Sequence, residues 1–304
     1  MTPDVLAKWH RHAMRRQAEY AMSSSPFWRN LYRSVDLDDT PNTWPLISET
    51  DLQEAGESML CIPQSQVSRI ISLTTSGSTG KPKRIYFSAA DLDLTVAFFA
   101  HGLTTFTLPG ERIFICMNGD STDSLGHLLS KAALCAGRTP QLYGDLIDYD
   151  EAAAAATAFD PDCVAGHPRQ ILRLAEQTPT LRPRTTLLSA DILPVELRNR
   201  VNTLWQTEVY DHWGMRETGL GGALECSAHN GYHIRHADLY LEIIDPQTGL
   251  VLPDGETGEL VLSTLNRDAM PLIRYRTGDY TRLINEVCPC GSVFKRLGTI
   301  GRRV

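Results

Sequence analysis

The sequence predicts an α/β fold, with a mainly parallel sheet flanked by helices and a smaller antiparallel β subdomain. Between residues 69 and 235, short apolar runs alternate with segments of helical periodicity. Such alternation is typical of a parallel sheet that helices cover on both faces. After residue 235, strand-like runs are joined by Thr-Gly and Asp-Gly turns without a helical period, which favours antiparallel pairing. We therefore expect an α/β core domain at 1–235 and a β subdomain at 236–304.

The individual elements can be placed in chain order from their periodicity. Residues 4–33 carry apolar side chains at helical spacing, interrupted by Ser-Ser-Ser-Pro at 23–26. Two β-rich runs, 69–73 and 84–88, lie on either side of a Ser/Gly loop. Ser88 and Asp91 have the spacing of a capping box before an apolar helix. Further strands are predicted at 112–117, 161–166, 185–190 and 207–212, and further helices at 124–137, 150–160 and 169–177.

The composition is that of a globular protein that repels polyanions. The 304-residue chain is 42% hydrophobic and 21% charged, with a formal net charge of −7. This charge opposes non-specific binding to nucleic acid or to an anionic membrane, and no basic patch compensates for it. Charged residues occur throughout the N-terminal segment, which therefore predicts neither a signal peptide nor a membrane span. We expect a cytoplasmic protein whose isolated cysteines are reduced core thiols, namely Cys61, Cys116, Cys135 and Cys163.

The loop at 72–83, Ser-Leu-Thr-Thr-Ser-Gly-Ser-Thr-Gly-Lys-Pro-Lys, has the composition of a phosphate-binding segment. Glycines let the backbone approach a ligand, and hydroxyls, lysines and free N–H groups are donors for phosphate oxygens. The loop is not a standard P-loop, because Thr75 and Pro82 stand where that pattern needs a Gly and a Ser or Thr. A flexible Ser/Gly surface turn is the alternative interpretation.

Four segments in a fixed order carry a resemblance to a known family: TSGSTGKPK at 75–83, HWGMRETG at 212–219, GETGELVLSTL at 255–265 and YRTGD at 275–279. Together they resemble the adenylate-forming superfamily, the AMP-binding or acyl-activating enzymes. The stretch from 241 to 284, with ALEC and GYHI before it and CPCG after it, is similar to the phenylacetate–CoA ligase branch. The resemblance implies an enzyme that joins a carboxylic acid to AMP, with ATP or AMP and Mg²⁺ as cofactors.

The resemblance assigns roles to the Ser/Gly loop and to the glutamate motif. It places the β- and γ-phosphates of ATP in the loop, where N–H groups, hydroxyls and Lys83 offset charge on the departing pyrophosphate. Glu217 matches the family's magnesium-binding glutamate, and a hard oxygen ligand suits Mg²⁺. The expected catalytic residues are Glu217, Lys83 and Thr79. The expected loop contacts with the nucleotide are Thr75, Ser76, Gly77, Ser78, Thr79, Gly80 and Lys83.

The resemblance also assigns residues to the nucleoside. Asp279 matches the aspartate that accepts both ribose hydroxyls, and Arg302 lies at the family's hinge. Without the motifs, Asp279 would be interpreted as a turn residue and Glu217 as a surface carboxylate. Trp213 stands where Tyr is more usual, and Arg216 replaces a small hydroxyl residue. The two segments expected around the adenine are Ser189, Ala190 and Asp191, and Trp213, Gly214 and Met215 with Arg216 and Glu217.

The grouped cysteines predict a structural zinc site. Cys226 and His233 lie close in the sequence, and Cys288-Pro-Cys290 supplies two thiolates that can reach one ion. One Cys₃His set forms a closed tetrahedral zinc site without an open position for chemistry. His233 is preferred as the histidine because it follows the Gly-aromatic pair as in the resembling branch, and the competing candidates are His229 and His236. Free thiols with incidental histidines are the alternative.

The superfamily's mobile C-terminal domain, which carries a catalytic lysine, is expected to be absent, because the chain stops at the Gly-Arg hinge. The chain is then either a fragment or a natural core protein. The expected partners are a carboxylic acid and an acyl acceptor, namely coenzyme A, a carrier protein or a reductase, but neither nucleic acid nor a membrane. An aryl or heteroaryl acid follows from the branch resemblance, with Phe99, His101, His127 and His167 around it.

Two other functions fit the same sequence. One is a non-catalytic partner that binds a nucleotide or an acyl group in a biosynthetic complex. The other is an acyltransferase that moves an acyl group from a thioester to a carrier without ATP. Because Glu217, Asp279 and the phosphate loop are all present, the sequence favours ATP-dependent chemistry.

Overall fold

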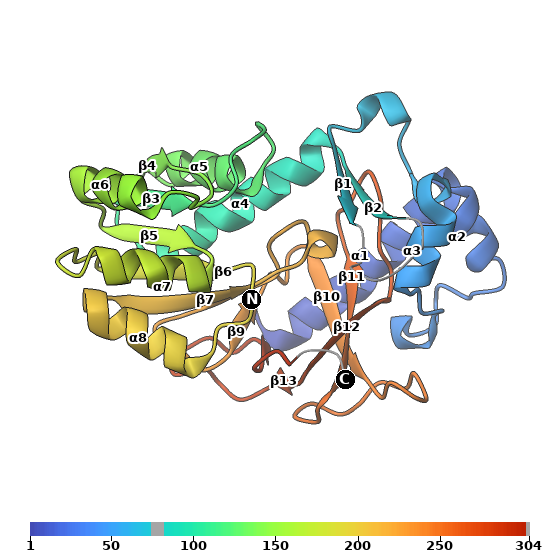
Figure 1. Ribbon diagram of the computed structural model, residues 1–304. Helices are drawn as coiled ribbons and strands as arrows, with labels where there is room; N and C mark the ends of the chain where they lie inside the picture. The colour runs from blue at the N-terminus through green and yellow to red at the C-terminus, as the bar shows by residue number, and fades with distance from the viewer. Residues whose placement is uncertain (74–81, 302–304) are drawn as a thin grey trace. The chain divides into compact units, whose positions relative to one another are not determined.

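The computed structural model describes residues 1–73 and 82–301, and these form two compact units (Figure 1). Unit 1 comprises Met1–Asp91, Arg216–Gly219 and His233–Val304, and unit 2 comprises Leu92–Met215 and Leu220–Tyr232. The chain enters each unit more than once, so neither unit is a single continuous segment. The domain boundary expected at residue 235 stays a prediction.

Unit 2 is built on the parallel sheet that the apolar runs predict. Its neighbouring strands follow the order β8-β7-β6-β5-β3-β4, and all neighbours pair in parallel except β7 and β8. The strands are β3 (Arg112–Cys116), β4 (Thr139–Leu142), β5 (Cys163–Gly166), β6 (Thr185–Ser189), β7 (Glu208–Trp213) and β8 (Ala223–Glu225). The sequence pattern does not predict β4, which contains Pro140 and ends the order, a place where a missing N–H is tolerated.

Helices cover both faces of this sheet (Figure 1). On one face, Phe114, Val164 and Leu188 pack in a core with α6, α7 and α8. On the other, Leu187 faces α4 and α5, and Tyr210 stacks on Phe106 of α4 with ring centroids 4.9 Å apart. Adjacent side chains of a strand point to opposite faces, so fully apolar strands serve both layers. The helices are α4 (Ala89–Phe106), α5 (Leu125–Cys135), α6 (Tyr149–Phe159), α7 (Pro168–Gln177) and α8 (Val195–Trp205).

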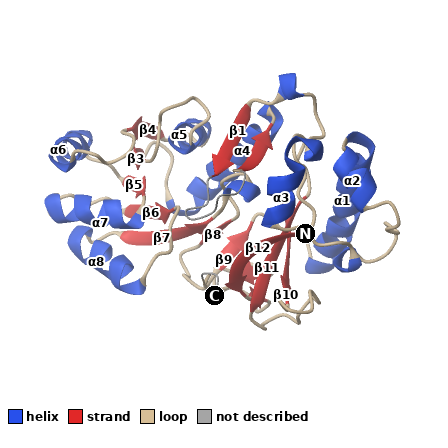
Figure 2. Cartoon of the chain, turned by 45° about the vertical axis from the view of Figure 1, so that its right-hand side comes forward, coloured by secondary structure: helices blue, strands red, loops and turns tan. Residues whose placement is uncertain are grey.

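Unit 1 contains the antiparallel part of the fold. Its three-stranded sheet has the order β10-β11-β12, and these strands lie side by side in Figure 2. The same unit holds the hairpin of β1 (Arg69–Leu73) and β2 (Lys83–Phe87) that the two β-rich runs predict. The other strands are β9 (Tyr232–Ile234), β10 (Leu239–Ile244), β11 (Gly258–Thr264), β12 (Tyr275–Thr281), β13 (Leu283–Ile284) and β14 (Arg296–Leu297).

The N-terminal helical segment consists of two helices, divided within the Ser-Ser-Ser-Pro sequence that interrupts the helical pattern. Ser25 ends the first helix and caps the second, and its hydroxyl also donates to the carbonyl of Ser58 at 2.7 Å. Pro26 then fits the first helical position, where its missing N–H has no intrahelical partner to lose. The helices of this unit are α1 (Pro3–Ser24), α2 (Pro26–Leu31) and α3 (Glu49–Ala55), with 3₁₀ turns at Pro41–Thr43, Gly56–Met59, Gln64–Gln66 and Arg216–Thr218.

Three further sequence expectations can be compared with the structure. The capping box is confirmed, because the amide of Ser88 donates to Asp91 at 2.9 Å and the amide of Asp91 donates to Ser88 at 3.1 Å. The prediction for Cys135 is wrong: it is the last residue of α5, where its side chain is exposed rather than in the core. Among the described helices, none combines the length and apolar character that crossing a bilayer requires.

Candidate active site

The candidate phosphate loop can be followed only at its end. Thr75, Ser76, Gly77, Ser78, Thr79 and Gly80 lie outside the described residues, as does Arg302. Lys83 is the first residue of β2, and its side chain is buried. The pairing of β1 with β2, from Arg69 opposite Phe87 to Leu73 opposite Lys83, fixes where the loop starts and ends. The ends of the loop are therefore at the close of one hairpin.

Lys83 and Glu217 form a buried ion pair although 134 positions of sequence number separate them. The ammonium of Lys83 lies 2.5 Å from Oε1 of Glu217 and 3.5 Å from Oε1 of Glu49. The hydroxyl of Tyr275 donates to the same Oε1 of Glu217 at 3.3 Å. Glu217 is 2% exposed, and a charge at such depth requires a partner. The pairing brings together two of the three residues expected to be catalytic, each from a different motif, and the third, Thr79, lies outside the described residues.

Asp279 lies on β12, which also contributes Tyr275 to this cluster. Its amide donates to the hydroxyl of Thr277 at 3.0 Å, and its side chain is partly exposed. The preceding Gly278 has φ +74° and donates its amide to Glu259 at 3.2 Å. A positive φ is strained for residues with a Cβ, which accounts for the glycine of the Thr-Gly-Asp segment. Arg216 begins the 3₁₀ turn that contains Glu217 and is exposed.

In unit 2, the two segments expected around the adenine follow neighbouring parallel strands. Ser189 ends β6 and is paired in register with His212 of β7, one residue before Trp213. The carboxyl ends of adjacent parallel strands are the usual ligand-binding edge of an open α/β sheet. Ala190 and Asp191 come directly after β6, and Gly214 and Met215 directly after β7. The structure thus brings the two segments to the same edge.

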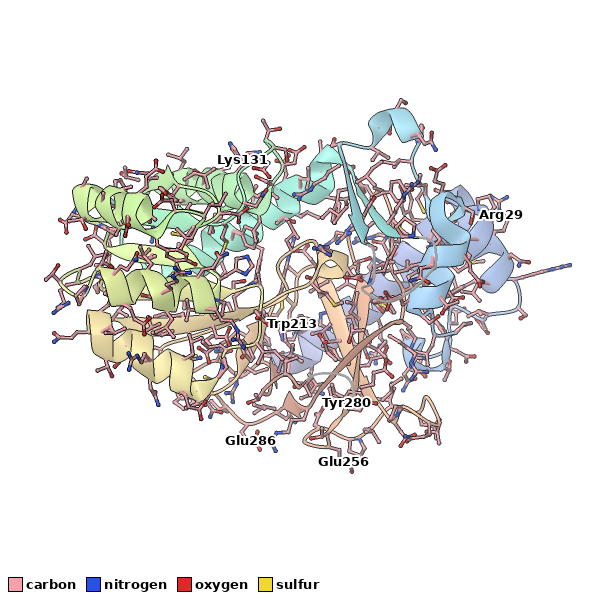
Figure 3. The ribbon with its side chains drawn as sticks, viewed as in Figure 1. Arg29, Lys131, Trp213, Glu256, Tyr280 and Glu286 are labelled. Atoms are coloured by element: carbon pink, nitrogen blue, oxygen red, sulfur yellow. The ribbon has the colours of Figure 1, made fainter. Side chains whose placement is uncertain are left out.

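Local backbone geometry explains several residue types in these segments. Ala190 has φ +71°, an uncommon value for a residue with a Cβ and a feature that clusters at functional sites. A Cβ on Gly214 would lie 2.5 Å from the carbonyl oxygen of Leu220, so only glycine fits there. A Cβ on Gly222 would lie 2.4 Å from the ring of Trp213, so the glycine backbone packs closely against the indole. Figure 3 labels Trp213, which ends β7.

An apolar cavity lies beside this edge, between the sheet of unit 2 and helices α4 and α5. The space between its lining atoms is about 390 Å³ when the open solvent at its mouth is counted. Phe98, Phe99 and Leu103 of α4 line one side, and Leu125 and Leu129 of α5 line another. Among the residues that line it, the only polar side chains are those of Ser189 and His212. The lining therefore suits an apolar group at the carboxyl edge of the sheet.

The cavity differs from the acid pocket that the sequence suggests. Phe99 lines it, whereas His101 is exposed, His127 contacts Ser124 at 3.2 Å and His167 precedes the first residue of α7. Sequence reasoning missed His212, although that residue stands inside a quoted motif. The sequence signal that could have identified His212 as a site residue is its position beside Trp213 at the end of a predicted strand. Its pairing with Ser189 depends on strand order, which local sequence does not reveal.

Three of the four predicted zinc ligands lie together in unit 1. The ligand atoms of His233, Cys288 and Cys290 are all within 4.8 Å of one another, and Nε2 of His233 is 3.5 Å from Sγ of Cys290. The amide of Gly291 donates to the carbonyl of Cys288 at 2.8 Å, which closes the Cys-Pro-Cys-Gly turn. Cys226 comes directly after β8 and belongs to unit 2. Two thiols and an imidazole at these separations fit a zinc ion.

Comparison with known proteins places these features in a family. The model of the AMP-binding enzyme family matches residues 28–266. The chain belongs to this family. A phenylacetate–coenzyme A ligase of Pseudomonas putida is 28% identical over 92% of this chain and 67% of the relative. Another phenylacetate–coenzyme A ligase, of Aromatoleum evansii, is 30% identical over 87% of this chain and 63% of the relative.

Solved structures of AMP-binding enzymes share the fold. An open conformation of 2-hydroxyisobutyryl-CoA ligase has a TM-score of 0.88 at 20% identity, covering 100% of this chain and 76% of that one. An amide bond synthetase from Marinactinospora thermotolerans has a TM-score of 0.60 at 17% identity, covering 79% of this chain and 49% of that one. These likenesses confirm the predicted fold class. The family model and the sequence relatives identify the chain as an enzyme of the acyl-adenylate-forming ligase type.

Proposed function

We propose that this AMP-binding enzyme uses ATP to activate an aryl or heteroaryl carboxylic acid, and that the acyl group then passes to coenzyme A or another thiol acceptor. In the first step, a carboxylate oxygen attacks the α-phosphorus of ATP. The bond between the α-phosphorus and the bridging oxygen breaks, and pyrophosphate leaves. The observation that carries the proposal is the buried cluster of Lys83, Glu217 and Tyr275, which brings together residues from three motifs expected to bind the nucleotide.

The cluster supplies fixed charges for a reaction between two anions. Lys83 follows the loop expected to hold the β- and γ-phosphates, and its ammonium offsets charge on the departing pyrophosphate. A carboxylate has about four acceptor positions, so Glu217 keeps acceptor capacity for Mg²⁺ while it pairs with Lys83. Bound Mg²⁺ would neutralise phosphate charge. Glu49, 3.5 Å from the ammonium of Lys83, holds that side chain in position when the carboxylate of Glu217 is engaged elsewhere.

The remaining contacts concern the nucleoside and the acid. Ser189 to Asp191 and Trp213 to Met215 hold the adenine at the carboxyl edge of the sheet, where the indole of Trp213 offers a stacking face. Asp279 accepts the ribose hydroxyls. The apolar cavity beside Ser189 and His212 takes the hydrocarbon part of the acid, and its phenylalanines suit an aromatic ring. An acid and ATP held by the same chain react in an effectively intramolecular step.

We further propose a structural zinc ion held by His233, Cys288 and Cys290, with Cys226 as the fourth ligand. The six residues between Cys226 and His233 allow Cys226 to reach the ion, since each extended residue spans up to about 3.5 Å. Four protein ligands leave no open position, so zinc would stabilise the fold and take no part in the reaction.

ATP–pyrophosphate exchange with a panel of aryl, heteroaryl and aliphatic acids tests the proposed activity. We expect exchange with aryl or heteroaryl acids, and a loss of about 10²–10³-fold in the Lys83→Met variant. Lys131→Met is the matched control, because Lys131 pairs with Asp93 at 2.9 Å on the exposed side of α5 and should keep the parent rate (Figure 3). A folded chain that exchanges with no acid, and that Mg-ATP does not stabilise against heat, would contradict the proposal.

A further inference from the structure

His212 has a polar atom that nothing in the described structure satisfies. Its Nδ1 lies 2.8 Å from the hydroxyl oxygen of Ser189. Its Nε2 is buried and has no hydrogen-bond partner among the described residues. Buried polar atoms in proteins are nearly always hydrogen-bonded, so an exception at a cavity wall indicates a missing partner. His212 lines the apolar cavity, which makes a bound ligand the natural source of that partner.

The imidazole of His212 is neutral at physiological pH. Burial lowers its pKa to about 4, and the rings of Phe98 and Phe99 lie beside it with centroids 6.1 Å away. In a neutral imidazole, one nitrogen donates and the other accepts, and the hydrogen bond at Nδ1 decides which. The hydroxyl of Ser189 can either donate to Nδ1 or accept from it, so Nε2 can offer either a proton or a lone pair. A hydroxyl or amino group can meet either form.

The surroundings of Nε2 disfavour a charged group on the ligand in addition to its carboxylate. Apart from Ser189 and His212, the residues that line the cavity have apolar side chains or none. An unpaired ionised group transferred into such surroundings loses its hydration without compensation. Asp211, the neighbouring carboxyl on β7, is engaged elsewhere, since it accepts from the hydroxyl of Tyr232 at 2.7 Å. The group that meets Nε2 is accordingly polar but uncharged.

Building on the proposed function, we propose that His212 is a specificity-determining residue that recognises a neutral hydrogen-bonding substituent on the acid. The substrate class is an aromatic carboxylic acid whose ring carries a hydroxyl or amino group. The ring packs against Phe98 and Phe99, and the substituent bonds to Nε2 of His212. Ser189 is a positioning residue, which holds the orientation of the imidazole through its contact with Nδ1.

Pyrophosphate exchange with benzoate and its three hydroxy and three amino isomers tests this assignment. The parent should prefer at least one substituted isomer over benzoate by about 10–100-fold in kcat/KM, mainly through KM. In His212→Leu this ratio should fall to within about threefold of one, and His212→Gln should keep part of it, because an amide still offers a hydrogen bond. Ser189→Ala should lower the ratio in part, because the imidazole loses the contact that orients it.

The matched control is His127→Leu, which removes another histidine that contacts a serine but does not line the cavity. It should keep the parent ratio. A ratio unchanged in His212→Leu would overturn the assignment, as would an equal loss for every acid, which would mean that His212 holds the common carboxylate. Exchange with aliphatic acids alone would leave adenylation standing and overturn only the substrate class. Exchange with no acid would overturn both proposals.

Discussion

Two ion pairs in unit 1 are similarly buried, but only one of them is expected to have a catalytic role. Lys83 and Glu217 lie 2.5 Å apart, and Arg274 and Glu242 lie 3.1 Å apart with similarly low exposure. The sequence predicts functional roles for the first two residues because each stands in a recognisable motif. The sequence does not predict the pair of Arg274 and Glu242. Glu242 lies on β10, 32 positions before Arg274, and no motif includes it.

Glu217→Gln and Glu242→Gln separate a catalytic role from a structural one. Each change leaves a buried cation without its full charge partner, so each should lower the free energy of unfolding by about 3–5 kcal/mol. Only Glu217→Gln should also lower pyrophosphate exchange, by about 10²-fold, because only Glu217 is expected to act at the phosphates. Denaturant unfolding and exchange assays, run where both variants are folded, measure the two effects. Equal exchange rates in the two variants would show that Glu217 serves the fold alone.

His212 should make the protein sensitive to acid. Its folded pKa of about 4 lies below the ordinary value of 6.5, so between these values the unfolded chain binds a proton that the folded chain does not. Stability is therefore fully present above pH 6.5 and falls as the pH drops toward 4. Between pH 7.5 and 5 the loss should reach about 2 kcal/mol. His212→Leu should remove that part of the pH dependence of urea unfolding, and identical pH profiles for parent and variant would contradict the burial of a neutral imidazole.

At the level of elements, the sequence predicts the strands and helices whose local pattern of apolar residues identifies them. The strands at 112–117, 161–166, 185–190 and 207–212 all correspond to strands of the parallel sheet, because each is a short apolar run buried on both faces. Helix α8 and strand β4 are not predicted, since α8 contains several polar residues and β4 contains a proline. Their structure depends on packing against neighbours that the local sequence does not specify.

Two capping boxes of the same form allow an element-scale prediction. Asp51 in α3 and Asp91 in α4 each accept from the amide of a serine three residues before. Asp91 also accepts from the amides of Asp268 and Ala269, at 2.8 and 3.0 Å, and is 3% exposed. Asp91→Ala should lower the free energy of unfolding by about 3 kcal/mol or more, because several buried N–H groups lose their acceptor. Asp51→Ala should cost about 1 kcal/mol in urea unfolding, and equal losses would contradict the role given to the 268–269 contacts.

At the scale of the whole molecule, sequence texture predicts both kinds of sheet but not the division into units. The parallel strands β3 to β7 lie in unit 2, and the antiparallel sheet of β10, β11 and β12 lies in unit 1. The N-terminal helices nevertheless belong to unit 1, where the side-chain amide of Gln17 donates to the carbonyl of Arg267 and accepts from its N–H. Contacts between residues 250 positions apart leave no periodic signal in a sequence.

The proposed zinc ion predicts a response confined to part of the molecule. A zinc ion that binds the folded chain but not the unfolded chain adds to the free energy of unfolding. Removal of the zinc should therefore destabilise the segments that supply its ligands. Treatment with a zinc chelator should speed amide hydrogen exchange around 232–234 and 283–297, where His233, Cys288 and Cys290 lie. Strands β5 and β6, in the core of unit 2, should keep the protection of the untreated protein.

Cys288→Ser should reproduce the faster hydrogen exchange seen with the chelator. The parent should release about one zinc ion per chain to the chelator, and the variant should release none. Cys135→Ser is the matched control, because Cys135 is an exposed thiol outside the cluster and should leave zinc content and exchange unchanged. Cys226→Ser gives the result that decides the fourth ligand: it should weaken zinc retention as Cys288→Ser does. Full zinc retention in Cys226→Ser would assign the fourth position to another group, and a purified parent chain without zinc would contradict the metal site as a whole.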